Sequence, residues 1–272
     1  DNIRTKDNDK YEFKYRDIPR YIKNYLVRKL SNQRSDLKNK FYEVLERIDY
    51  VVTVMKEDAD FIRSKVPGFK ATHLPFTYYY DLTTHTENIP KTRQHINSLI
   101  VGNSAAYTNN HLDAFNLLSK VEFSPDFKIY TPLSYGVKGE NGKKYIDEVI
   151  KQGQNLLQDQ FEPLTEFIEK KEYYSFLNSI DIGLFYHKRP QAFGNILMLL
   201  GTGTKLFMYP NTTYKFFKRN NLYVYRLDEF NEEWRKPLKD SHAEINYNFV
   251  SNFCSRDKNI RLLKKILAND EY

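Results

Sequence analysis

Polar and basic side chains follow four of the strands that the sequence predicts, at the point where each strand would end. The first of these loops is Gly102 to His111 (GNSAAYTNNH). The others are Pro132 to Gly136 (PLSYG), Thr165 to Phe167 (TEF) and His187 to Asn195 (HKRPQAFGN). Because the carboxyl ends of parallel strands meet at one edge of a sheet, we expect these loops to converge. The sequence therefore predicts a ligand cleft at that edge.

The loop from His187 to Asn195 has the groups that bind an anion. Arg189 or Lys188, together with the backbone N–H groups of Gly194 and Asn195, would hold a diphosphate and stabilise its charge as a leaving group. Such a cationic pocket makes a divalent metal unnecessary, so we expect neither a metal nor a cofactor. The simpler interpretation, in which Lys188 and Arg189 are solvated surface charges, remains open from the sequence.

The other loops offer neutral hydrogen-bonding groups. Gly102 permits a tight turn, and Ser104, Asn109 and Asn110 stand where a helix begins, so the two asparagines could equally be helix caps. The ribose and the flat base of a nucleotide could be bound by four further residues, Thr165, Glu166, Tyr173 and Tyr174. The two tyrosines could instead belong to the core.

Strands and helices alternate regularly from Asn97 onward, which predicts a doubly wound α/β domain. The segment from Ile182 to Tyr209 reads as one βαβ step with unbroken apolar strands, as expected in the middle of a parallel sheet. The predicted strands are Ser98–Val101, Lys128–Thr131, Phe161–Leu164, Ile182–Tyr186, Lys205–Tyr209 and Leu222–Tyr225. The predicted helices are His111–Lys120, Lys144–Leu157, Lys170–Ser179, Asn195–Leu200 and Thr213–Asn220.

The two ends of the chain are less regular. Residues 1–95 are expected to form a partial, Rossmann-like N-terminal domain with strands at Tyr50–Met55 and Ala71–Phe76, a linker from about residue 78, and its opening strands absent from this chain. Residues 96–245 would form the nucleotide-binding domain. Residues 246–272 would form a C-terminal region with one long helix, Asn246 to Leu267.

The composition of the chain limits the classes of ligand that it would bind but does not identify one of them. The 272 residues include 42 Lys and Arg against 35 Asp and Glu, with 22 Tyr and 19 Phe. A basic, tyrosine-rich chain suits nucleic acid, anionic lipid or a phosphorylated small ligand. The single cysteine excludes an internal disulfide. Motifs for dinucleotide dehydrogenases (GxGxxG), P-loop enzymes, serine hydrolases (GxSxG) and HExxH zinc enzymes are all missing from the sequence.

A basic amphipathic helix is predicted from Ile18 to Leu30, where apolar residues recur at three- and four-residue steps. It either packs against its own domain or contacts an anionic membrane surface. No apolar run is long enough to span a bilayer. We expect a cytoplasmic protein that is peripheral at the inner face of the plasma membrane.

Five blocks of the sequence resemble one family of transferases. They are VGNSAAYTNNHLDAF, IYTPLSYG, YIDEVIKQG, FEPLTEFIEKKEYYSFLNSIDIGLF and RPQAFGNILMLLGTGTKLF, and their order and spacing span roughly residues 97–227. Together they are similar to the enterobacterial 4-acetamido-4,6-dideoxygalactose (N-acetylfucosamine) transferases. The resemblance implies a metal-independent glycosyltransferase of the GT-B type, with a complete C-terminal doubly wound domain that binds the donor.

The resemblance also implies the substrates. The donor would be a nucleoside-diphosphate sugar, dTDP- or UDP-linked, and the acceptor a lipid-diphosphate-linked saccharide of a surface polysaccharide. His111 and Pro132 carry over from the family pattern. Residues and resemblance together give these donor-binding candidates: Gly102, Asn103, Ser104, Asn109, Asn110, Ser134, Tyr135, Thr165, Glu166, His187, Arg189, Gln191, Gly194 and Asn195.

The base that accepts the acceptor's proton is not identified by the sequence. Its candidates are His187, Glu166, Asp81 and His85. Two other functions remain open at this point: a non-catalytic nucleotide-sugar-binding or scaffold protein, and a single-stranded nucleic-acid-binding module. The latter is disfavoured because basic and acidic residues are interspersed, so we expect no nucleic-acid partner.

Overall fold

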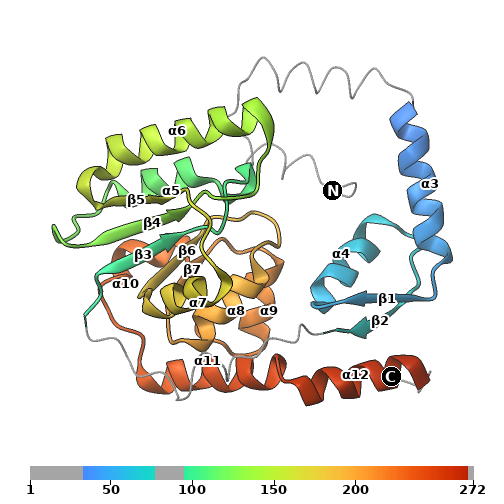
Figure 1. Cartoon of the computed structure of the whole chain (residues 1–272). Coiled ribbons are helices and arrows are strands. Elements are labelled where there is room, and N and C mark those ends of the chain that lie inside the picture. Colours follow the sequence, from blue (N-terminus) through green and yellow to red (C-terminus); the bar gives the residue numbers. More distant parts are fainter. Residues whose placement is uncertain (1–32, 77–94, 269–272) are drawn as a thin grey trace. The chain divides into compact units, whose positions relative to one another are not determined.

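A computed structural model describes residues 33–76 and 95–268, which fall into two compact units (Figure 1). The larger unit comprises residues 95–258. The smaller unit comprises residues 33–76 with 259–268, so the boundary runs through the last helix, α12 (Arg256–Ala268). Each unit is described by itself. Ile18 to Leu30, Asp81 and His85 lie outside the described residues.

The larger unit contains a six-stranded sheet in which every neighbouring pair of strands is parallel. Its order is β5-β4-β3-β6-β7-β8, so the chain first runs outward from β3 and then returns to continue on the other side at β6. This arrangement confirms the predicted doubly wound α/β class. The strands are β3 (Ser98–Val101), β4 (Lys128–Pro132), β5 (Phe161–Leu164), β6 (Ile182–Phe185), β7 (Lys205–Met208) and β8 (Tyr225–Arg226).

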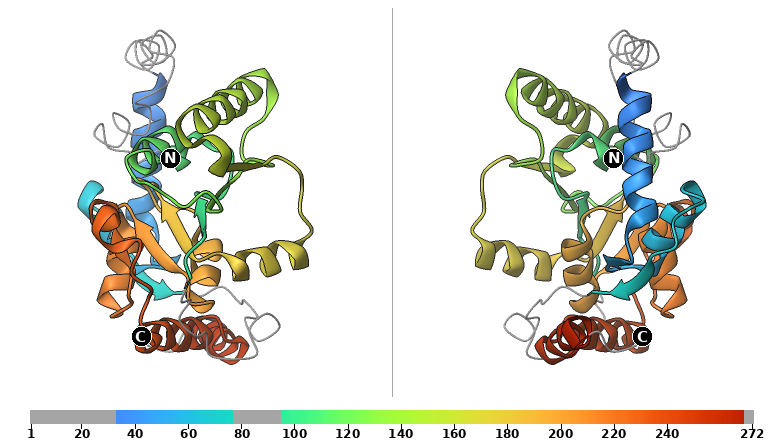
Figure 2. Two further views of the ribbon diagram at one scale, coloured as in Figure 1. Left: turned by 90° about the vertical axis from the view of Figure 1, so that its left-hand side faces the viewer. Right: turned by 90° about the vertical axis from the view of Figure 1, so that its right-hand side faces the viewer.

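Helices cover both faces of this sheet (Figures 1 and 2). The crossovers leading outward from β3 place α5 and α6 on one face, and the crossovers leading back place α7 and α8 on the other, as right-handed connections require. Helix α8 packs against α7 and α11. The helices are α5 (His111–Leu118), α6 (Gly139–Leu157), α7 (Lys170–Ser179), α8 (Phe193–Gly201), α9 (Thr212–Arg219), α10 (Phe230–Glu233) and α11 (Asp240–Phe253). Three short 3-10 turns accompany them: η1 (Tyr107–Asn109), η2 (Gln158–Gln160) and η3 (Leu227–Glu229).

The centre of the sheet is the apolar core of this unit. Every residue of β6 and β7 is buried, and so are residues 196–201 of α8. These are the continuous apolar runs of the sequence, and burial on both faces is what such strands need. The predicted βαβ step is therefore confirmed.

The last strand is shorter than the sequence predicts. A strand was expected over Leu222–Tyr225, but β8 contains only Tyr225 and Arg226. The buried side chain of Asn246 on α11 occupies both backbone groups of Tyr223: Asn246 Oδ1 accepts from its N–H at 2.9 Å, and Asn246 Nδ2 donates to its carbonyl at 3.1 Å. Tyr223 is thus held by a helix instead of by the strand ladder.

The prediction of one long C-terminal helix is wrong, because α11 ends at Phe253 and α12 begins at Arg256. The break lies at Cys254 and Ser255. Ser255 Oγ accepts a hydrogen bond from the Lys258 N–H at 3.2 Å, as an N-cap residue does, and this starts a new helix.

The smaller unit contains two helices and two parallel strands before its α12 segment. They are α3 (Gln33–Arg47), β1 (Tyr50–Thr53), α4 (Lys56–Lys65) and β2 (Thr72–Pro75), with β1 paired to β2. Both predicted strands are present, each shorter by two residues. The core consists of Leu45, Val66, Phe69 and Ala71. Within the residues described for the two units, no helix is both long and apolar enough to cross a membrane.

Candidate functional site

The candidate site lies where the order of the strands reverses, between β3 and β6. Here the chain leaves two neighbouring strands in opposite directions, which opens a crevice at their carboxyl ends, the usual ligand site of doubly wound sheets. Two of the predicted loops meet at this point. One follows β3 (residues 102–110) and the other follows β6 (residues 186–192), and buried side chains join them.

Asn109 is the centre of this connection. Its side chain is fully buried, and its Oδ1 accepts a hydrogen bond from the Asn103 N–H at 2.9 Å. The same oxygen lies 2.8 Å from Nε2 of His187, in the other loop. Asn109 Nδ2 donates to Ser104 Oγ at 3.2 Å and to the Ala106 carbonyl at 3.0 Å. One amide therefore closes the β3 loop and ties it to the β6 loop.

Asn110 makes a second connection between the loops. It precedes α5 in a left-handed backbone conformation, and its side chain does not cap the helix. Asn110 Nδ2 instead donates to the Tyr186 carbonyl at 3.0 Å. The interpretation of Asn110 as a side-chain cap is therefore wrong.

Two buried histidines, His111 and His187, flank this network. Burial lowers the pKa of each imidazole to about 3, and each is therefore neutral at physiological pH. For His187, the nearby His111 and the charge of Arg189 lower the pKa further. His111 Nδ1 lies 2.9 Å from the hydroxyl oxygen of Tyr145 on α6. The histidines thus contribute hydrogen bonds without charge.

A chain of hydrogen-bonded polar groups leads from the buried network to the exposed side chain of Tyr135. Gln191 Nε2 donates to Asn103 Oδ1 at 3.2 Å, and Asn103 Nδ2 donates to the Tyr135 hydroxyl at 3.0 Å. The Thr108 hydroxyl donates to Gln191 Oε1, and Arg189 Nη2 donates to Thr108 Oγ1 at 3.4 Å. The guanidinium of Arg189 is therefore directed toward the β3 loop, whereas Lys188 Nζ lies 6.0 Å from the centre of each of two tyrosine rings, Tyr186 and Tyr209.

Gly194, in the first turn of α8, is exposed and borders open space. Ala192, which precedes the helix, has φ of 57°, in the left-handed region that few side chains tolerate. A Cβ added to Gly194 would have no atom within 4 Å. The first backbone N–H groups of a helix have no partner within the helix and carry its positive dipole end, so an anion placed there would be stabilised.

Asn195 connects this helix end to α7. Asn195 Nδ2 donates to the Tyr173 hydroxyl at 3.1 Å, and burial raises the pKa of Tyr173. Ser134, Thr165 and Glu166 also follow strands of this sheet, but their side chains are exposed and lie outside the hydrogen-bond network. The structure therefore brings together nine of the predicted residues most closely: Gly102, Asn103, Ser104, Asn109, Asn110, Tyr135, His187, Arg189 and Gln191.

Asn211 is a site residue that the sequence reasoning missed. Its Nδ2 donates to the carbonyls of His187 at 2.6 Å and Arg189 at 3.2 Å, which fixes the β6 loop from behind. Its Oδ1 caps α9 by accepting from the Tyr214 N–H at 3.1 Å. The signal that could have found it is Pro210-Asn211-Thr212, a typical helix start after a strand.

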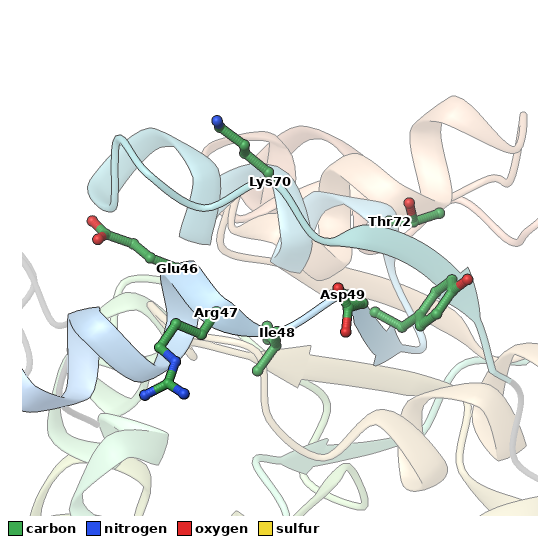
Figure 3. A pocket seen from close by; sticks show the side chains of 7 residues that line it. Glu46, Arg47, Ile48, Asp49, Lys70 and Thr72 are labelled. Atoms are coloured by element: carbon green, nitrogen blue, oxygen red, sulfur yellow. The ribbon is translucent and has the colours of Figure 1, made fainter.

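The smaller unit contains a pocket of about 450 Å³ (Figure 3). It lies at the amino ends of β1 and β2, away from the carboxyl edge at which α/β sheets bind ligands. Glu46, Arg47 and Lys70 line it, and Figure 3 shows the Arg47 side chain extending away from those of Glu46 and Lys70. Across the two described stretches of the chain, no three His, Cys, Asp or Glu side chains cluster as a metal site would require.

Solved structures share this fold at low sequence identity. A trehalose-phosphate synthase (UDP-forming) from Burkholderia xenovorans, in complex with glucose-6-phosphate, has a TM-score of 0.62 and 8% identity, over 88% of this chain and 63% of that chain. The corresponding enzyme from Burkholderia vietnamiensis has a TM-score of 0.58 and 10% identity, over 85% and 63%. A glycosyltransferase from Rickettsia africae has a TM-score of 0.61 and 16% identity, over 85% and 68%.

These likenesses show the GT-B fold that the resemblance predicted, and the chain spans about 63% of the length of the two trehalose-phosphate synthases. The family itself is shown by sequence. Residues 27–256 match the model of the 4-alpha-L-fucosyltransferases, glycosyl transferase group 56, and this range includes both loops of the candidate site. The chain therefore belongs to glycosyl transferase group 56, the 4-alpha-L-fucosyltransferase family.

Proposed function

We propose that this protein transfers a deoxyaminosugar-type residue from a nucleoside-diphosphate sugar, dTDP- or UDP-linked, to a lipid-diphosphate-linked saccharide during synthesis of a surface polysaccharide. The observation that carries the proposal is the junction of the β3 and β6 loops at the point where strand order reverses, beside the open amino end of α8. Membership of a family of glycosyltransferases supports the same function.

The diphosphate of the donor would bind between the two loops. The first N–H groups of α8 would bind phosphate oxygens, since no side chain at Gly194 covers them. Arg189, in the loop that leads into α8 and directed toward the β3 loop, would add a charge-assisted hydrogen bond. The tight turn at Gly102 and Asn103 lets the backbone approach the ligand closely, as glycine-bearing turns do in other nucleotide sites.

The same groups would assist the reaction. An acceptor hydroxyl attacks the anomeric carbon, the bond from that carbon to the diphosphate oxygen breaks, and the hydroxyl proton passes to a base. The charge that develops on the departing diphosphate would be stabilised by Arg189 and the α8 dipole, so we propose that the reaction needs no divalent metal. Glu166 remains a candidate base, because its exposed carboxylate lies after β5 on the site's edge of the sheet.

Nucleotide binding tests the proposal most directly. UDP or dTDP, with EDTA present, is expected to stabilise the protein by about 2.7 kcal/mol at a concentration of about 100 times Kd. Arg189→Ala is expected to weaken binding about tenfold or more, because a charged hydrogen bond is lost. Thermal shift and calorimetric titration measure both effects.

Lys188→Ala is the matched control, because it removes the neighbouring charge, which lies over Tyr186 and Tyr209. We expect it to weaken binding less than threefold, roughly the effect of a screened surface charge. The absence of a thermal shift with any nucleoside diphosphate would contradict the proposed function. Equal losses in the two variants would contradict the role of Arg189.

The proposal includes an anionic membrane surface as a partner, through the predicted basic helix Ile18 to Leu30. Neutralising Arg20, Lys23, Arg28 and Lys29 in that helix is expected to abolish flotation of the protein with anionic liposomes. Each basic residue near such a surface contributes about 1 kcal/mol, so four substitutions should weaken binding by several hundredfold. If the unaltered protein does not float with anionic vesicles, this part of the proposal is wrong.

A further inference from the structure

We infer that His187 is a positioning residue for the donor: as a neutral imidazole protonated at Nε2, it orients Asn109 and thereby holds the β3 loop in register with the amino end of α8. The inference rests on the proposed function, because the ligand that it positions is the diphosphate of the donor. It assigns His187 a role other than that of a proton acceptor.

The tautomer follows from the partners of Asn109. The Asn103 N–H can only donate, so the Asn109 atom 2.9 Å away must be its oxygen. That oxygen is also 2.8 Å from His187 Nε2, and two acceptors cannot share a hydrogen bond. Nε2 therefore bears the proton. Reversing the amide would also break the hydrogen bonds from Asn109 Nδ2 to Ser104 Oγ and the Ala106 carbonyl.

Burial makes this hydrogen bond important for the position of the loops. Asn109 is 0% exposed and His187 is 1% exposed, so no bulk water can replace either partner. Without the N–H of His187, Asn109 Oδ1 would accept a hydrogen bond only from the Asn103 N–H. The hydrogen bond that joins Asn109 in the β3 loop to His187 in the β6 loop would be lost. An unmade hydrogen bond in such a place costs more than a formed one contributes.

The hydrogen bond links two loops whose other ends are already fixed. Asn211 holds the carbonyls of His187 and Arg189, and the β6 loop leads directly into α8. On the other side, Asn109 closes the turn at Gly102 and Asn103. A diphosphate that contacts both the turn and the amino end of α8 requires both in one arrangement before it binds, and such preorganisation determines affinity.

The surroundings of His187 agree with a neutral ring. His111 from α5 and Arg189 from its own loop are the titratable or charged groups that act on it, and both disfavour a second proton. The backbone of Gln191 acts in the opposite sense and offsets only part of this lowering of the pKa, and no side chain within residues 33–76 and 95–268 hydrogen-bonds to Nδ1. A proton acceptor for a substrate hydroxyl must reach the substrate, whereas this ring is enclosed.

Two substitutions separate positioning from packing. His187→Leu removes the donor, and we expect UDP and dTDP to bind about tenfold or more weakly at temperatures where the variant is folded. His187→Gln places an amide N–H where Nε2 stood, so we expect it to rescue the affinity to within about threefold of the original protein. A role in packing alone predicts that neither folded variant changes the affinity, and a role as catalytic base predicts that glutamine does not rescue turnover.

A third variant controls for lost stability. Phe127→Leu reduces a buried ring just before β4, at the amino edge of the sheet, where it packs on Phe123 and Trp234. It is expected to lower stability and leave nucleotide affinity unchanged. Unchanged affinity in His187→Leu, or equal losses in the leucine and glutamine variants, would overturn the inference.

Nitrogen-15 NMR of the histidine ring provides a readout that does not depend on the ligand. We expect His187 to show a protonated Nε2 and an unprotonated Nδ1, with no change between about pH 8 and about pH 5. The opposite tautomer, or titration in that range, would refute the positioning role even if nucleotides bind. If Nε2 carries the proton but no nucleoside diphosphate binds, the proposed function is wrong, and His187 then has no donor to position.

Discussion

Acidification from about pH 7.5 to about pH 5 is expected to lower the unfolding free energy of the larger unit by about 4 kcal/mol, through His111 and His187. Burial lowers the pKa of both imidazoles to about 3, from 6.5 in the unfolded chain. Between these values the unfolded chain binds more protons than the folded one, so stability falls as the pH falls. Each histidine contributes about 1.4 kcal/mol per pH unit, or about 2 kcal/mol at pH 5.

Denaturant unfolding at the two pH values, followed by tryptophan fluorescence, measures this loss. The only tryptophan in the sequence, Trp234, is 5% exposed in the core of the larger unit and reports on that unit. His187→Gln provides the control, since it keeps an N–H donor but cannot titrate, and it is expected to remove about half of the pH dependence. The same pH dependence in both proteins would show that His187 is not the source.

One group in the smaller unit acts in the opposite direction. Burial, and then the charge of Glu57, raise the pKa of the Asp58 carboxyl to about 6. The folded smaller unit therefore binds a proton at Asp58 more tightly than the unfolded chain does, and acidification stabilises the folded unit. Comparing His187→Gln with the original protein at each pH cancels this contribution.

Gly102→Ala is expected to destabilise the larger unit by about 3 kcal/mol or more and to abolish nucleotide binding. Gly102 has φ of +65°, and an added Cβ would lie 2.4 Å from Asn109 Oδ1. The side chain of Asn109 would have to move, which breaks its hydrogen bonds to the Asn103 N–H and to His187 Nε2. Backbone strain contributes about 1–2 kcal/mol of the loss, and the broken network contributes the rest.

Gly139→Ala is the matched control for this substitution. Gly139 begins α6 with φ of +70°, close to that of Gly102, but an added Cβ has nothing within 4 Å. Only the backbone strain should remain, about 1–2 kcal/mol, with nucleotide affinity intact. Denaturant unfolding and calorimetric titration of the two variants make the comparison. Equal losses of stability would mean that contact with Asn109 adds nothing.

Most elements of the larger unit could be predicted because their signals are local. The strand predicted at Ile182–Tyr186 is β6, and the strand predicted at Lys205–Tyr209 is β7, each within one residue of the observed end. A continuous apolar run is a property of neighbouring residues, and in a doubly wound sheet it is buried on both faces. The fold class follows from the alternation of such runs with helical segments.

Two of the errors arose where a distant side chain overrode the local pattern. Leu222–Tyr225 has the composition of a strand, but the backbone of Tyr223 is bound by Asn246, which lies 23 residues later on helix α11. Asn110 stands where a cap is expected, but its left-handed backbone and its hydrogen bond to the Tyr186 carbonyl, 76 residues away, give it another role. Neither partner is visible from the residues next to it.

The sequence by itself determined the class of fold, the family and the edge of the sheet at which ligand groups gather, because periodicity and motif order are written in adjacent residues. Only the tertiary structure decided which of those groups act together. Asn109 and His187 are separated by 78 positions and meet because β3 and β6 are neighbours in the sheet. Their contact is a consequence of strand pairing, which depends on the packing of the whole unit and not on any local pattern.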